Sequence, residues 1–165
     1  MSNELRIGGK AIRAACSLSA AGALVFNAFP LFLSTLAGEF SFTDLQMGLL
    51  GSYYLAGAAS VALFAPLWVS TLPWRTTACA GFGLMLVSLG CLAIANESMV
   101  YWSMALLGMG SAVVFTLGLT VLSAAPDPDR AFGVKLIAEM ILGAFTMFVM
   151  TTFIIVAFGY IGFLV

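Results

Sequence analysis

The stretch from Ser98 to Pro126, SMVYWSMALLGMGSAVVFTLGLTVLSAAP, contains no charged residue. It is longer than the roughly 20 residues that a helix needs to cross a hydrocarbon core of about 30 Å. A surface helix of a soluble protein would carry a polar stripe with a period of 3.6 residues, and this stretch has none. The stretch therefore predicts a transmembrane helix.

The same pattern recurs on both sides of this stretch. Hydrophobic residues make up 62% of the chain and charged residues 8%, whereas about a quarter of the residues in a soluble domain are charged. The mean hydropathy is +1.13. We therefore expect an all-α, polytopic transmembrane helix bundle in which residues 1–165 form a single transmembrane domain. The expected spans are 14–37, 45–68, 75–95, 98–123 and 129–158, with the start of a sixth span at 160–165.

The basic residues occupy alternate connections between the expected spans. They are Arg6, Lys10, Arg13, Arg75, Arg130 and Lys135, whereas the remaining connections carry Glu39, Asp44 and Glu97 with no basic residue. Because Lys and Arg accumulate in cytoplasmic connections, this distribution predicts a cytoplasmic N-terminus. We expect a multi-pass integral protein of the plasma (inner) membrane.

Three of the expected spans begin with residues that cap helices. Thr43 followed three residues later by Gln46 has the spacing of a capping box. Asn96 can cap the fourth span, and Asp127 precedes a proline at the first position of the fifth. Glycines lie along the spans, and we expect them to allow close packing between helices. These glycines are Gly51, Gly57, Gly81, Gly83, Gly108, Gly110 and Gly118.

Several segments occur in the order that is typical of one family of transporters. The first span contains Pro30, and Leu36–Ala59 reads LAGEFSFTDLQMGLLGSYYLAGAA. The fourth span contains Gly108-Met109-Gly110, residues 126–133 read PDPDRAFG, and residues 159–165 read GYIGFLV. In this order the segments resemble the N-terminal six-helix half of the major facilitator superfamily of secondary transporters.

The resemblance implies transport of a small solute by alternating access, with a substrate site near the bilayer midplane between two halves. We expect the chain to break off at the start of a sixth helix, so that transport needs a second half or another copy of the chain. In this resemblance the first helix lines the cavity. The resemblance also implies a gating contact of Asp129 and Arg130 in the cytoplasmic connection, and it makes Arg75 the arginine kept from the family's loop between helices two and three.

The chain also departs from the family pattern. Residues 65–78, APLWVSTLPWRTTA, lack the aspartate and glycines of the family's loop motif. Met104 stands where the family has an arginine in helix four, and residues 131–158 contain no proline. These departures argue against the proton antiport that is common in the family.

Glu139 is the most informative residue for function because it lies inside the fifth span, where an ionisable group is costly. Lys135 lies four residues earlier, so the two side chains can pair on one helix face near the cytoplasmic interface. Alternatively, Glu139 faces a cavity and handles a substrate or a proton, or it packs against a second half. The sequence leaves these alternatives open.

Polar side chains inside the other spans are further candidates for the cavity. Asn27 precedes Pro30, which frees a backbone carbonyl, although an interhelical hydrogen bond explains such an amide equally well. Tyr53 and Tyr54 lie two turns into the second span, and only one of them can face inward because neighbours on a helix are about 100° apart. We therefore take Asn27, Tyr53, Tyr54 and Glu139 as candidate residues of a substrate or coupling cavity.

An enzymatic function is not expected. The chain contains no histidine, which excludes the Ser-His triad and the H-E-x-x-H metal motif. It also lacks a P-loop and a pair of carboxylates within the spans. We expect no catalytic residue, metal or cofactor and no nucleic-acid partner, and we expect the lipid bilayer and an unknown small-molecule substrate as partners. The alternatives to a transporter are a packing or assembly subunit that transports nothing and an inactive truncated remnant.

Overall fold

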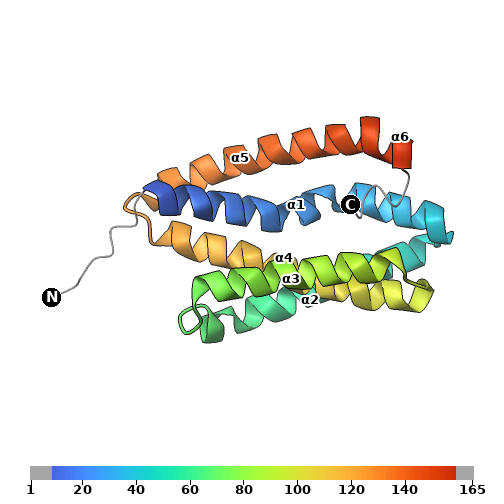
Figure 1. The fold of residues 1–165 in the computed structure, drawn as a ribbon, viewed down its shortest axis with the longest axis horizontal. Helices are drawn as coiled ribbons and strands as arrows, with labels where there is room; N and C mark the ends of the chain where they lie inside the picture. The colour runs from blue at the N-terminus through green and yellow to red at the C-terminus, as the bar shows by residue number, and fades with distance from the viewer. Residues whose placement is uncertain (1–8, 159–165) are drawn as a thin grey trace.

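The computed structural model describes residues 9–158, which form helices joined by short connections (Figure 1). Five helical segments are long and apolar enough to cross a membrane, which confirms the predicted all-α, membrane-spanning architecture. The expected start of a sixth span at 160–165 lies outside the described residues. The elements are α1 (Gly9–Phe40), α2 (Asp44–Trp68), α3 (Trp74–Ala93), α4 (Glu97–Ser123), α5 (Pro128–Val149), a π-helical turn (Met150–Ile154) and α6 (Ile155–Phe158).

Two helices differ from the expected spans. Helix α1 already covers residues 9–13 at the edge of the described part of the chain, which the expected span 14–37 left out, and Lys10 and Arg13 are good helix formers. It also continues through Pro30. The fifth span is interrupted at Met150–Ile154 by the π-helical turn, where the Thr151 hydroxyl donates to the carbonyl of Met147 over 2.7 Å. Such turns are rare, and propensity alone does not predict them.

The predicted helix starts are confirmed. Thr43 caps α2, and its side chain and that of Gln46 form a complete capping box. The Asn96 side chain accepts a hydrogen bond from the Met99 amide at the start of α4, and Asp127 accepts one from the Arg130 amide at the start of α5. These bonds satisfy amides that have no partner within the helix, so they fix where each helix begins.

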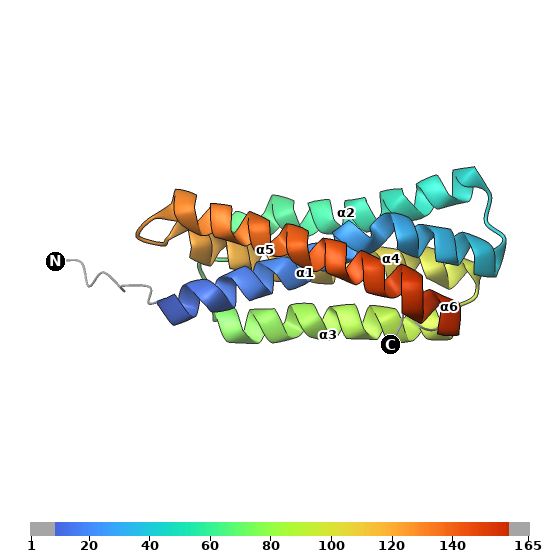
Figure 2. The same cartoon turned by 90° about the horizontal axis from the view of Figure 1, so that it is seen from above.

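Helix α4 is the centre of the bundle and packs against α1, α2 and α3 (Figures 1 and 2). It presents a glycine to each neighbour. A Cβ atom at Gly108 would collide with the carbonyl of Tyr54 on α2, one at Gly110 would lie 2.9 Å from the carbonyl of Gly81 on α3, and one at Gly118 would lie 2.7 Å from the Ser19 amide on α1. The backbones therefore approach so closely that only glycine fits.

Not every expected packing glycine lies in an interface. Gly57 faces the Ala105 carbonyl and Gly81 faces Val114, as expected for close packing. Gly51 makes only ordinary contact with Phe29. The expectation for Gly83 was wrong, because a Cβ atom there would meet open space. Gly83 is two residues from Gly81, so it lies on a different face of α3.

Helix α5 is held less firmly than the other spans. It packs mainly against α1 and makes only minor contact with α4 (Figure 2). Only 6% of its most apolar segment is buried, compared with 44% for α4. Large apolar side chains such as Ile141 and Phe145 are therefore exposed along α5.

The two ends of the bundle differ in charge and in packing. The N-termini of α1, α3 and α5 lie at one end, so Arg13, Arg75 and Arg130 lie there, whereas Glu39, Asp44 and Glu97 lie at the opposite end (Figures 1 and 2). The larger core lies toward the acidic end and consists of Phe32, Leu36, Phe42, Leu50, Tyr54, Leu92, Val100, Met104 and Leu107. Among residues 9–158, the core at the basic end is smaller and consists of Ala15, Leu122, Ala125 and Ala131, with Ile12, Cys16, Val121 and Phe132 packed against it.

Ser41 offers a test of the connection between α1 and α2. Its φ of 53° lies in the left-handed region, which costs a non-glycine residue about 1–2 kcal/mol. We expect Ser41→Gly to raise the free energy of unfolding in detergent micelles by about 0.5–1 kcal/mol. Ser52→Gly, the same change at an exposed site inside α2, should lower it by a similar amount. Destabilisation by both changes would contradict this account of Ser41.

Candidate functional site

A cavity of about 700 Å³ lies between α1, α2, α4 and α5. Its lining residues include Asn27 of α1, Tyr54 of α2 and Ser111 of α4, each near the middle of its helix. Most of the wall is apolar and consists of alanines together with Phe26, Leu55, Phe115 and Met140. This size and lining are typical of a site for a small molecule with a large apolar surface.

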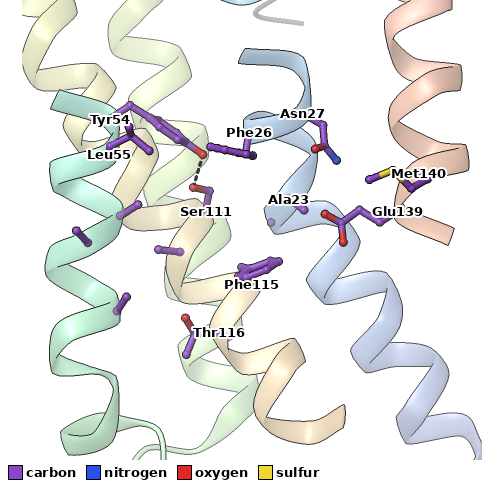
Figure 3. Close-up of a pocket in the computed structure, with 15 residues that line it drawn as sticks. Ala23, Phe26, Asn27, Tyr54, Leu55, Ser111, Phe115, Thr116, Glu139 and Met140 are labelled. Carbon is purple, nitrogen blue, oxygen red and sulfur yellow. Dashed lines mark hydrogen bonds between the residues drawn. The ribbon is translucent and has the colours of Figure 1, made fainter. Parts of the chain in front are cut away.

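Tyr54 and Ser111 join α2 and α4 at the cavity wall. Their hydroxyl groups are 2.9 Å apart and form a buried hydrogen bond (Figure 3). The Ser111 hydroxyl also donates to the Gly108 carbonyl over 3.0 Å, and the Phe29 ring lies 4.7 Å from that of Tyr54. The Tyr54 ring is therefore held rigidly, with its polar end at the cavity.

Asn27 lies between the cavity and α5. Its side-chain amide and carbon atoms pass over Gly143, where an added Cβ atom would lie 3.4 Å from Nδ2. Asn27 is half-buried, and Figure 3 shows its amide on the side of α1 that faces α5. A glycine opposite the amide lets α5 approach α1 at this level.

Glu139 both pairs with Lys135 and faces the cavity, two arrangements that the sequence left as alternatives. It forms an ion pair with Lys135, one turn earlier on α5, and it also lines the cavity. Lys135 is 4% exposed and Glu139 9% exposed, so the pair is buried within the bundle. The Lys135 ammonium also lies 4.7 Å from the centre of the Phe115 ring, over its face. The carboxylate thus belongs both to the wall and to an internal ion pair.

The other candidate residues lie away from the cavity. Tyr53 points toward the acidic end of α4, where its ring packs against Tyr101 and Trp102 at centroid distances of 5.5 and 5.8 Å. Of the two neighbouring tyrosines, Tyr54 is the one that lines the cavity. The guanidinium of Arg75 lies over the Trp74 ring near the start of α3.

Asp129 and Arg130 occupy the first turn of α5, at the basic end, and both are exposed. Arg130 contributes to a small crevice of about 300 Å³ together with Ile12 of α1. These two charged residues therefore lie beside the connection between α4 and α5, well away from Glu139.

Sequence reasoning missed the contribution of α4 to the cavity. Ser111, Phe115 and Thr116 all line it, and the first two lie one turn apart on the face that also carries Gly108. The spacing of Gly108, Ser111 and Phe115, at i, i+3 and i+7, indicates that the three residues lie on one face of the helix. The Lys135–Phe115 contact joins residues far apart in the chain, so no local pattern could predict it.

The side chains around the cavity provide groups that can bind a molecule. Within residues 9–158, no three His, Cys, Asp or Glu side chains come together to hold a metal ion. One carboxylate, one amide and a few hydroxyls can orient a bound molecule whose apolar body contacts the wall. Comparisons with protein-family models, curated proteins and solved structures found no match to this chain.

Proposed function

We propose that the chain is a secondary transporter of the major facilitator type, which moves a small solute across the membrane by alternating access. The observation that carries this proposal is the cavity at mid-length of α1, α2, α4 and α5, where polar groups interrupt an apolar wall. A solute site near the bilayer midplane is what alternating access requires. In this proposal the cavity is completed by a second half or by another copy of the chain.

The difference between the two ends supports the same proposal. In the described part of the chain, large aromatic and aliphatic side chains form the core toward the acidic end, and a smaller core lies at the basic end. A bundle with unequal packing at its ends can open at one end while the other stays closed. Following the positive-inside rule, we propose that the basic end and the N-terminus are cytoplasmic, in the plasma membrane.

Cysteine labelling tests this proposal without knowledge of the substrate. The native Cys16, Cys79 and Cys91 are first replaced by alanine, and a single cysteine is then introduced at Ala59 or Ala112, both of which line the cavity. If alternating access operates, a membrane-impermeant maleimide should label both positions when it is added from either side of a proteoliposome. Leu86→Cys is the control, because this residue lies at mid-length of α3, is 69% exposed and does not line the cavity.

The labelling pattern separates the alternatives. Labelling at Ala59 and Ala112 from both sides, with none at Leu86, supports a pathway for solute that opens to each side in turn. If Ala59 and Ala112 are labelled from one side alone, the cavity opens to only that side of the membrane, which contradicts alternating access. No labelling from either side contradicts a water-filled cavity and favours a membrane subunit that packs against partner helices.

A further inference from the structure

One carboxylate dominates the chemistry of the cavity wall. Among the described residues that line the cavity, Glu139 is the one that carries a formal charge. Its Oε2 atom faces the Lys135 ammonium and accepts no hydrogen bond from other described residues. Lys135 itself is 4% exposed and does not line the cavity. A molecule that enters the cavity therefore meets the carboxylate and not the ammonium.

The aromatic part of the wall also favours a positive charge. The faces of Phe and Tyr rings attract cations, and the attraction strengthens where water is excluded. Phe115 already interacts in this way with Lys135, at 4.7 Å. Phe26 and Tyr54 also line the cavity (Figure 3).

An anion or a sugar-like molecule fits this wall poorly. An anion cannot take the place of the Lys135 ammonium beside the Glu139 carboxylate, because like charges at close range repel. A polyhydroxylated molecule would bury more donors and acceptors than the few polar groups of the wall can satisfy, at a cost for each unpaired group. A largely apolar molecule with one positive group meets neither penalty.

From this arrangement we propose that the cavity binds a hydrophobic organic cation. In this proposal the Lys135 ammonium competes with the bound cation for the Glu139 carboxylate and the Phe115 ring. This proposal rests on the proposed transport function and names its class of substrate. The Lys135 ammonium contacts both the Glu139 carboxylate and the Phe115 ring. A bound cation takes over these two contacts, so that Glu139 stays paired. The displaced Lys135 ammonium turns toward the start of α5 at the basic end of the bundle, where it leaves the low-dielectric interior.

Two ions of matched shape and opposite charge test the proposal. The purified 165-residue chain in detergent is titrated with tetraphenylphosphonium and with tetraphenylborate, and binding is measured by equilibrium dialysis. We expect tetraphenylphosphonium to bind at least tenfold more tightly than tetraphenylborate. Glu139→Gln should weaken its binding at least tenfold, whereas Glu97→Gln, the same change at an exposed site on α4, should leave it unchanged.

A charge exchange separates a binding role from a structural one. The double variant with Lys135→Glu and Glu139→Lys keeps an ion pair on α5 but presents an ammonium to the cavity. We expect it to prefer tetraphenylborate, whereas a purely structural pair would leave the preference unchanged and overturn the proposal. Circular dichroism and size-exclusion chromatography establish that each variant is folded, and if the exchanged pair does not fold, Glu139→Gln decides.

The outcomes also distinguish this inference from the proposed function. Equal binding of the two ions by the native chain, or unchanged binding by folded Glu139→Gln, overturns the assignment of a cation. If the cysteines in the cavity are still labelled from both sides in that case, the transport proposal stands without it. Charge-dependent binding combined with labelling from one side only supports the cation site and contradicts transport.

Discussion

Replacing Gly108 by alanine is expected to lower the free energy of unfolding by about 2–3 kcal/mol. The new methyl group would collide with the Tyr54 carbonyl and would also approach the Ala58 amide to 3.1 Å. Both contacts are with backbone atoms, so no side chain can move aside, and α2 must shift away from α4. Overpacking of this kind costs about 1–3 kcal/mol or more and outweighs the roughly 1 kcal/mol that alanine gains over glycine in a helix.

Gly83→Ala is the matched control for this prediction. Gly83 also lies inside a predicted span, but an added methyl group there meets open space. We expect it to leave stability unchanged or to raise it by up to about 1 kcal/mol. Unfolding of both variants is followed by circular dichroism in micelles. Equal stability of the two would contradict the close approach of α2 and α4.

The Gly108 variant should also disturb the cavity. Tyr54 and Ser111 are held 2.9 Å apart by the close contact of α2 with α4, and Ser111 bonds to the carbonyl of residue 108. Separating the helices lengthens the hydrogen bond between the two hydroxyls. Binding of tetraphenylphosphonium should therefore weaken in Gly108→Ala and stay unchanged in Gly83→Ala.

The sequence predicts the helices of this bundle better than their arrangement. Runs without charge have to be helical in a membrane because every backbone group must be paired there, and Thr43, Asn96 and Asp127 mark where helices begin. The central position of α4 depends on contacts that its glycines make with backbone atoms of α1, α2 and α3, and the sequence does not show which glycine contacts which helix. Gly81 and Gly83 look alike in the sequence, yet only Gly81 faces another helix.

The candidate site was predictable only in its polar members. Asn27, Tyr54 and Glu139 stand out because polar groups are costly inside a span, and all three line the cavity. Tyr53 stood out for the same reason and packs elsewhere, because helical periodicity shows that neighbours face apart without showing which of them faces inward. Phe115 is one of many phenylalanines in an apolar chain, and only its contact with Lys135 distinguishes it.

Removing one member of the buried ion pair should have the largest effect on stability. Lys135→Met leaves the Glu139 carboxylate without its partner among apolar groups. Breaking a buried pair in this way costs about 3–5 kcal/mol, whereas an exposed pair contributes about 0–1 kcal/mol. Arg130→Met, which removes an exposed cation from the same helix, should change stability by no more than about 0.5 kcal/mol.

The double variant Lys135→Met with Glu139→Met completes the cycle. It removes both charges and fills the same space with apolar groups, so we expect stability to return to that of the native chain or to exceed it by about 1–4 kcal/mol. Loss of less than 1 kcal/mol in the single variant, with no recovery in the double, would place the pair at a hydrated interface. Recovery of stability without recovery of tetraphenylphosphonium binding would mean that the two charges serve the cavity rather than the fold. In that case the Lys135–Glu139 pair lowers the free energy of unfolding, and its role is to bind the cation in the cavity.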